Sequence, residues 1–172
     1  MKAPNQAGRK NDPELVEEVR SLLARHQPGA KFLEAPAWAV AASLMADDAP
    51  SLVVVAVPPD VTADVIEREL AAFPNAVVTD VARVNLAPLR ELRARGVVLT
   101  RCIGSHPLAG RERGGAISAR ADIFIGRPWV VCRDDETPRD DLAIVEDLAL
   151  DVGAMPLEMT PEDHDRSVAL VS

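Results

Sequence analysis

The chain has 172 residues, of which 48% are hydrophobic and 27% are charged, a balance typical of one globular domain with a hydrophobic core. The net charge of -8, without any block of Lys and Arg, argues against a nucleic-acid partner. No apolar run approaches the roughly 20 residues that a membrane span needs, and the polar N-terminus does not look like a signal peptide. Cys102 and Cys132 lie in apolar runs, so we expect free thiols and a cytoplasmic location.

The first 50 residues predict a flexible tail over 1–11 and then mixed elements. Asp12-Pro13 is a suitable helix start, and apolar residues at helical spacing follow it to Leu23. We also expect a short strand over 30–34 and a helix over 38–45. This part lacks the strand and G-x-G-x-x-G turn that open a dinucleotide-binding fold, so the first βαβ unit is incomplete.

From residue 51 onward, apolar runs alternate with segments of helical periodicity. Continuous β-branched runs are typical of strands buried on both faces of a parallel sheet. The fold class is therefore α/β: a Rossmann-like, mostly parallel sheet with flanking helices, in one partial domain over 12–172. The predicted strands cover 52–57, 75–81, 97–102, 127–132 and 155–159, and the predicted helices cover 61–72, 86–95, 137–152 and 160–172.

In such sheets, ligands bind outside the carboxyl ends of the strands. This rule selects Pro58-Pro59, the segment 79–85, the loop GSHPLAG over 104–110 and the turn after Cys132. His106 in that loop follows a predicted strand by four residues, where an imidazole can act as a general base near pH 7. Position alone also fits a loop histidine bonded to a backbone carbonyl.

The other polar residues either allow two interpretations or argue against a particular kind of site. Arg111 and Arg113 could bind a carboxylate or phosphate, or form a solvated charged turn. His164 shares a helix face with apolar residues, which favours a buried structural histidine. The three histidines and two cysteines show no metal-ligand spacing, so no metal is expected. Gly110 to Gly115 has P-loop spacing but lacks the Lys-Ser/Thr that must follow.

Five motifs follow one another between residues 51 and 172: LVVVAVPP, VVTDV, IGSHPLAGRERGG, ADIFIGRPWVVC and EDHDRSVALVS. In order and spacing they resemble the prephenate and arogenate dehydrogenases of tyrosine biosynthesis. The resemblance implies an NAD(P)-dependent oxidative decarboxylation of a small-molecule substrate, prephenate or arogenate. Hydride leaves the ring carbon that bears the 4-hydroxyl, the hydroxyl proton is drawn away, and loss of carbon dioxide aromatises the ring.

The resemblance also assigns roles to residues. It places the catalytic, hydroxyl-polarising histidine at His106. It implies substrate binding by Ser105, Arg111 and Arg83. The side of the cleft that receives NAD or NADP would be lined by Val57, Pro58, Thr79, Asp80 and Val81.

The chain departs from the family pattern in three ways. Where the family commonly has Asp-x-x-Ser-Val-Lys, Arg83 stands in place of the Ser and Asn85 in place of the Lys, so Arg83 could bind a carboxylate or block the site. The glycine-rich turn is missing, and the family's C-terminal helical dimerisation domain is absent from residues 1–172. We therefore expect weak or no turnover by this chain alone, and a homodimer stays open. The alternative is a non-catalytic remnant that binds a small anion or a partner protein.

Overall fold

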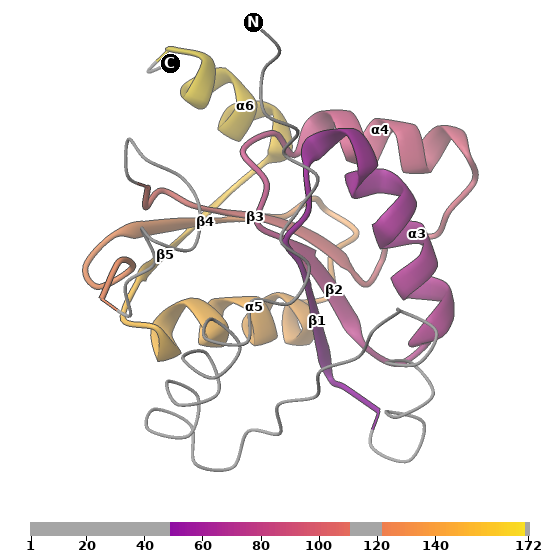
Figure 1. Ribbon diagram of the computed structural model, residues 1–172, viewed down its shortest axis with the longest axis horizontal. Coiled ribbons are helices and arrows are strands. Elements are labelled where there is room, and N and C mark those ends of the chain that lie inside the picture. Colours follow the sequence, from indigo (N-terminus) through magenta and orange to yellow (C-terminus); the bar gives the residue numbers. More distant parts are fainter. Residues whose placement is uncertain (1–48, 111–121, 171–172) are drawn as a thin grey trace, which may run out of the picture.

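The computed structural model describes residues 49–110 and 122–170 (Figure 1). The elements predicted before residue 49, together with Arg111 and Arg113, lie outside the described residues. Strands and helices alternate as predicted: β1 (Leu52–Val55), the 3-10 turn η1 (Pro59–Val61), α3 (Thr62–Ala72), β2 (Val77–Asp80), α4 (Leu86–Ala94), β3 (Cys102–Pro107), β4 (Pro128–Cys132), α5 (Arg139–Asp151), β5 (Met155–Met159) and α6 (Pro161–Leu170).

The five strands form one sheet in the order β1-β2-β3-β4-β5. β1, β2 and β3 are parallel neighbours, and β4 is parallel to β5, so the prediction of a mostly parallel sheet is confirmed. The exception is the pair β3 and β4, which is antiparallel and places His106 opposite Val130. The sequence did not show this reversal, because a continuous apolar strand has the same pattern in either direction.

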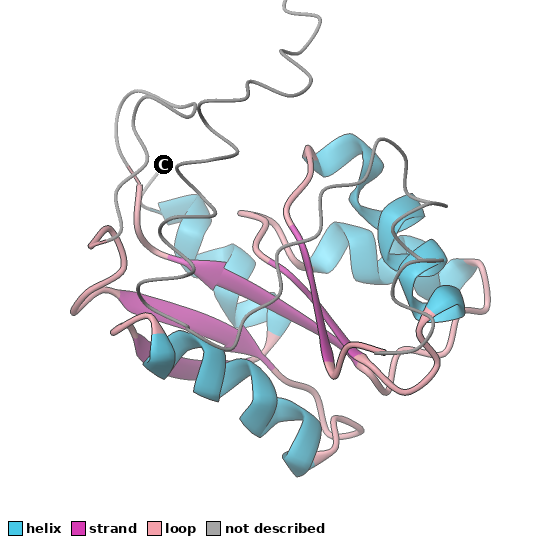
Figure 2. Cartoon of the chain, turned by 60° about the horizontal axis from the view of Figure 1, so that its bottom comes forward, coloured by secondary structure: helices cyan, strands magenta, loops and turns pink. Residues whose placement is uncertain are grey.

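Helices cover both faces of the sheet. α3, α4 and α6 lie on one face and α5 lies on the other, as Figures 1 and 2 show. One apolar cluster joins α3 and α4 to the strands around Val78, and a second joins α5 to the strands around Ile103 and Val131. The sheet therefore has an apolar core on each face, and these two cores hold the strand ends in place. A binding site at the edge of the sheet requires such a rigid support.

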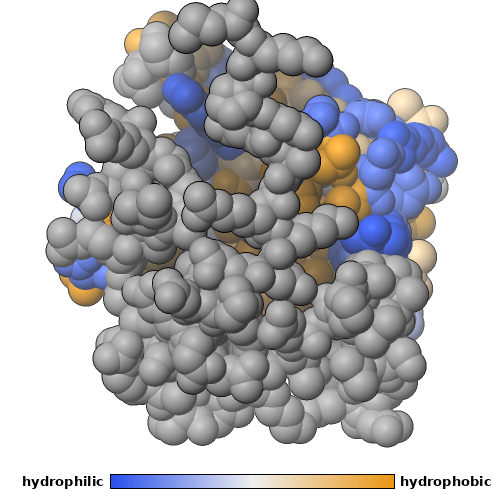
Figure 3. All heavy atoms as spheres, in the orientation of Figure 1, coloured by the Kyte–Doolittle hydropathy of each residue, from blue (hydrophilic) through white to orange (hydrophobic). Residues whose placement is uncertain are grey.

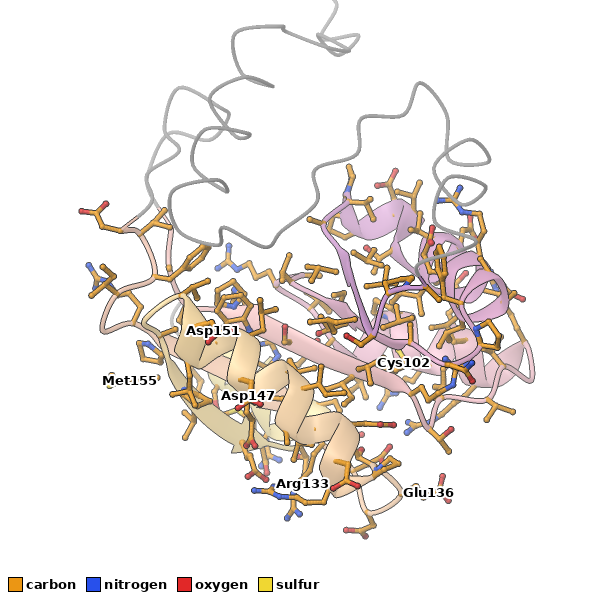
Figure 4. The ribbon with its side chains drawn as sticks, turned by 90° about the horizontal axis from the view of Figure 1, so that it is seen from below. Cys102, Arg133, Glu136, Asp147, Asp151 and Met155 are labelled. Carbon is orange, nitrogen blue, oxygen red and sulfur yellow. The ribbon has the colours of Figure 1, made fainter. Side chains whose placement is uncertain are left out.

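The outer helix surfaces are polar. Arg95 forms ion pairs with Asp64, Glu67 and Glu91, and hydrophilic side chains gather over α3 and α4 in Figure 3. In Figure 4, Asp147 lies on the solvent side of α5. No helix in the described ranges is both long and apolar enough to cross a bilayer.

The predicted third strand was wrong in position. We expected it over 97–102, but β3 covers Cys102–Pro107 and the preceding residues form a turn in which Val98 is 73% exposed. Apolar content dominated the prediction, whereas the small residues Gly104 and Ser105 occupy the crowded centre of the sheet, where both are buried. His106 consequently belongs to a strand, not to a loop beyond one.

α5 and α6 each follow a Thr-Pro pair, but only one of the two threonines caps its helix. Thr160 Oγ1 accepts the backbone N–H of Asp163 at 3.1 Å and caps α6. Thr137 does not cap α5; its hydroxyl donates to Asp134 Oδ1 at 3.0 Å and closes the preceding turn. Because α6 is fixed at its first turn, the position of His164 in that turn is well defined.

Candidate active site

The candidate site lies where the parallel strands β1, β2 and β3 reach the same edge of the sheet. This edge brings together the segment after β1 that contains Pro58, the end of β2 at Asp80, and His106 in β3. The turn after Cys132 does not belong to it, contrary to our expectation. Since β4 runs antiparallel to β3, its carboxyl end lies beside the amino-terminal part of β3.

His106 is half-buried on the sheet face that α6 covers. Its Nδ1 lies 3.0 Å from Nε2 of His164, and the two rings meet edge to face with centroids 5.1 Å apart. Burial lowers the pKa of His106 to about 4, with further lowering by His164 and Arg83 and an opposing effect of Asp165. The imidazole is therefore unprotonated at neutral pH and can accept a proton.

His164 is buried, with 1% of its surface exposed, as predicted for a structural histidine. The sequence did not reveal that its partner is His106, which lies 58 residues earlier. Its Nδ1 lies 2.8 Å from Oδ1 of Asp165, the next residue of α6. The motif EDHD marks this position, and only the packing of α6 on the sheet shows that it belongs to the site.

Asp165 also holds the beginning of α4. Its Oδ1 accepts the backbone N–H of Asn85 at 3.0 Å, and its Oδ2 accepts the backbone N–H of Leu86 at 3.1 Å. These are N–H groups of the first helical turn, which have no partner inside the helix, and the helix dipole favours a negative charge there. One carboxylate thus connects α4, α6 and His164.

Three of the predicted site residues prove to be buried. Ser105 donates to the backbone oxygen of Asp80 at 2.7 Å and lies 3.2 Å from the Thr79 hydroxyl. Ser105 and Thr79 are fully buried and Asp80 is 2% exposed. These groups join β2 to β3 beneath the site, and their predicted contacts with substrate and cofactor stay predictions.

The remaining predicted cofactor residues lie closer to the surface. Val57 packs partly on the α3–α4 core, Val81 packs partly on the α5 core, and Pro58 is exposed. Together they give the edge an apolar surface. Among the described residues, no group of three His, Cys, Asp or Glu side chains is arranged to hold a metal ion.

Arg83, which replaces the family serine, is exposed in the segment between β2 and α4. It is close enough to His106 to lower the pKa of that imidazole. Binding of substrate by Arg83 stays a prediction, and Arg111 lies outside the described residues.

Asp80 is a buried carboxyl group at the end of β2. Burial raises its pKa to about 7, although the carboxylate accepts the backbone N–H of Ala82 at 2.9 Å. Cys102 and Cys132 are buried free thiols, and burial together with the charge of Asp80 raises the pKa of each to about 12. Both thiols consequently stay protonated and have little nucleophilic character.

Gly104 and Asn85 are packed against each other beside His164. A Cβ at Gly104 would overlap Asn85 Oδ1 and lie 3.1 Å from its Cγ. The Asn85 amide nitrogen lies 3.2 Å from His164 Nδ1, and Asn85 is 1% exposed, so it has little room to move. A glycine is required at this position by close approach, not by an unusual backbone angle.

Comparison with known proteins identifies the family of the chain. The family model described as "Prephenate dehydrogenase, nucleotide-binding domain" matches residues 37–157. The chain belongs to the prephenate dehydrogenase family. His106, Arg83 and the end of β2 all lie within the matched range.

Individual relatives support the assignment. The chain is 40% identical over 119 residues to "Probable prephenate dehydrogenase NovF" of Streptomyces niveus, covering 69% of this chain and 33% of that protein. The crystal structure of Synechocystis arogenate dehydrogenase is 28% identical with a TM-score of 0.62, covering 76% of this chain and 46% of that one.

A prephenate dehydrogenase from Aquifex aeolicus, crystallised with hydroxyphenyl propionate and NAD+, has a TM-score of 0.73 and 23% identity. It covers 94% of this chain and 52% of that chain, and it shows the shared fold. The chain thus spans between a third and about half of the length of these three relatives.

Gly104→Ala should destabilise the fold by about 1–3 kcal/mol, because the added methyl group displaces a buried amide. Urea unfolding followed by circular dichroism measures the loss. Gly110→Ala is the matched control, since a Cβ there meets nothing within 4 Å and should change stability by less than about 0.5 kcal/mol. Equal effects of the two substitutions would contradict the close contact between Gly104 and Asn85.

Asp80→Asn should remove a pH-dependent cost of folding. The pKa of Asp80 is about 7 in the folded protein, against 3.8 for an unperturbed side chain. Between about pH 4 and 7 this carboxyl is ionised in the unfolded chain but largely protonated in the folded one, so the stability of the wild type falls as pH rises. One pKa unit corresponds to about 1.4 kcal/mol, so the effect is on the order of 4 kcal/mol.

The measurement is urea unfolding of both proteins at intervals between pH 5 and 8. The lowered pKa of His106 acts in the opposite sense, making stability fall as pH decreases from about 6.5 to 4, but it acts in both proteins and cancels in the difference. The stability of Asp80→Asn relative to wild type should rise with pH. A difference that does not change with pH would contradict a raised pKa.

Proposed function

We propose that this domain binds NAD or NADP at the carboxyl edge of its sheet and takes part in the oxidative decarboxylation of prephenate or arogenate. The observation that carries the proposal is His106: an unprotonated, half-buried imidazole at the strand edge, in contact with His164 and within the electrostatic influence of Arg83. Membership of the prephenate dehydrogenase family gives this arrangement its reaction class.

The described residues suit the nicotinamide end of the cofactor. Val57, Pro58 and Val81 offer an apolar surface for a flat ring at the ends of β1 and β2, and buried Thr79 and Asp80 support it from below. The turn from β1 to α3 contains Pro58-Pro59 and no glycine, so it is not a phosphate cradle. When bound, the nicotinamide ring supplies the acceptor for the hydride that leaves the substrate.

The side chains at this edge account for the remaining chemistry. The free nitrogen of His106 accepts the proton of the substrate 4-hydroxyl as the ring carbon becomes a carbonyl carbon. Arg83 pairs with a substrate carboxylate, a role for which guanidinium geometry is suited. Loss of carbon dioxide then forms the aromatic ring. The hydrogen bond from Ser105 to the backbone of Asp80 joins β3 to β2 beneath this site.

Two further statements belong to the proposal. The buried free thiols of Cys102 and Cys132 support a reducing, cytoplasmic compartment, consistent with biosynthesis of tyrosine. Homodimer formation stays a prediction, which light scattering of the purified chain would test.

Nucleotide binding and the role of His106 can be tested together. Calorimetric titration of the chain with NAD+ and with NADP+ should show binding of at least one of them in the micromolar range. His106→Asn should leave this affinity within about two-fold, because the imidazole acts on the substrate. With prephenate and saturating nucleotide, kcat of the variant should fall by about 10²–10⁴-fold.

The result distinguishes an enzyme domain from a non-catalytic remnant. Failure of both nucleotides to bind at millimolar concentration would refute the proposed function and favour a remnant that binds another anion or a partner protein. Full turnover by His106→Asn would leave nucleotide binding intact but assign the acceptor role elsewhere.

Arg83→Ala tests whether Arg83 binds substrate or obstructs it. If Arg83 pairs with the carboxylate, KM for prephenate should rise at least ten-fold with nucleotide affinity unchanged. The pKa of His106 should also rise, since a nearby positive charge is removed, and NMR titration of the imidazole measures this. Arg90→Ala, on the exposed side of α4, is the charge-matched control. A lower KM in Arg83→Ala would show instead that Arg83 blocks the site.

A further inference from the structure

The orientation of the His106 proton follows from a short chain of contacts that begins at Asp165. Its carboxylate can only accept hydrogen bonds, and it already accepts two backbone N–H groups at the start of α4. The third contact, His164 Nδ1 at 2.8 Å from Oδ1, therefore requires that the proton of His164 be on Nδ1.

The Asn85 amide does not change this assignment. Its Nδ2 also lies near His164 Nδ1, at 3.2 Å, but an amide N–H and a protonated ring nitrogen cannot form a hydrogen bond with each other. The contact with the carboxylate is shorter and charge-assisted, so it decides the tautomer.

The second ring follows from the first. With its proton on Nδ1, neutral His164 has a lone pair on Nε2, and His106 Nδ1 lies 3.0 Å from that atom. A hydrogen bond between them needs one donor, so His106 must carry its own proton on Nδ1. The remaining nitrogen of His106, Nε2, is then unprotonated and is not part of this chain of contacts.

We propose that His164 and Asp165 are positioning residues that hold His106 in the Nδ1–H tautomer, with Nε2 as the proton acceptor. The inference rests on the proposed function, in which His106 accepts the proton of a substrate hydroxyl. Neither positioning residue touches the substrate; each acts through the ring of His106. The role differs from that of a packing histidine, because it fixes which nitrogen of His106 can react.

The proton balance needs no further group. When Nε2 of His106 accepts the hydroxyl proton, the Nδ1 proton stays in its hydrogen bond to His164, and His106 becomes an imidazolium. His164 keeps its proton toward Asp165, whose negative charge favours the cation, whereas Arg83 on the β2–α4 segment disfavours it. Loss of carbon dioxide leaves a phenolate oxygen, which takes the proton back from Nε2 of His106 and restores the starting state.

The wild-type chain gives the first test. Long-range ¹H–¹⁵N correlation spectra at pH 7 distinguish protonated from unprotonated imidazole nitrogens, and His106→Asn assigns the resonances. We expect both His106 and His164 to carry the proton on Nδ1 and an unprotonated Nε2. A proton on Nε2 of His106 would overturn the inference without reference to any substrate.

Variants of His164 supply a matched pair. His164→Gln places an amide oxygen close to the former Nε2 position and should keep His106 in the Nδ1–H tautomer. His164→Phe keeps a ring of similar size without an acceptor and should move His106 toward the Nε2–H tautomer. Asp165→Asn removes the charge that fixes His164, so mixed tautomers are expected for both rings. An unchanged His106 spectrum in His164→Phe would refute the positioning role, and thermal melts identify any variant that does not fold.

Kinetics and nucleotide titration separate this inference from the proposed function. In His164→Phe, kcat should fall by about ten-fold or more, toward that of His106→Asn, while KM and nucleotide affinity stay unchanged. In His164→Gln, kcat should recover toward the wild-type value. Loss of nucleotide binding in wild type would refute the function but leave the tautomer result standing. Nucleotide binding with the wrong wild-type tautomer would refute only the positioning role.

Discussion

The carboxylate of Asp165 is the contact on which the candidate site depends. It satisfies two N–H groups at the beginning of α4 and one ring nitrogen of His164, so it fixes α6 against α4 and both against the sheet. α4 packs in the same apolar cluster as Val78 of β2, and β2 lies beside the strand that carries His106. The orientation of His106 therefore depends on α6 being packed against the sheet. The sequence around His106 does not indicate this dependence.

This dependence explains what the sequence could and could not predict. β5 and the starts of α4 and α6 were predicted closely, because apolar periodicity and helix caps are local properties. The direction of β4 and the contact between His106 and His164 are relations between distant segments, and one sequence does not contain them. Family resemblance identified His106 through the motif around it, while the geometry supplied its partner.

The misplaced third strand has a related cause. A run such as VVLT is apolar enough to suggest a buried strand, yet the centre of the sheet is occupied by Gly104 and Ser105. Gly104 is needed because the Asn85 side chain approaches the backbone there, and Ser105 is needed because its hydroxyl joins β3 to β2. Small residues are thus placed where space is limited and hydrogen bonds are shared, a requirement that hydrophobicity alone does not express.

Burial also changes how the polar residues of the family motif should be interpreted. The resemblance assigns Thr79, Asp80 and Ser105 to ligand binding, but their side chains are buried. The hydroxyls of Thr79 and Ser105 form hydrogen bonds with each other and with the backbone oxygen of Asp80. Desolvation raises the pKa of Asp80 to about 7, so this carboxyl adds little negative charge to the edge well below neutral pH.

The opposed charges around His106 give substrate binding a direct effect on its basicity. In the free domain, desolvation and the charge of Arg83 keep the pKa of the imidazole at about 4, which suits an unprotonated acceptor but makes it a weak base. A substrate carboxylate paired with Arg83 would cancel that positive charge, so the pKa of His106 would rise on binding, while burial and His164 would continue to lower it. The residue that replaces the family serine would then do more than hold the substrate: it would strengthen the proton acceptor only when a substrate carboxylate is present.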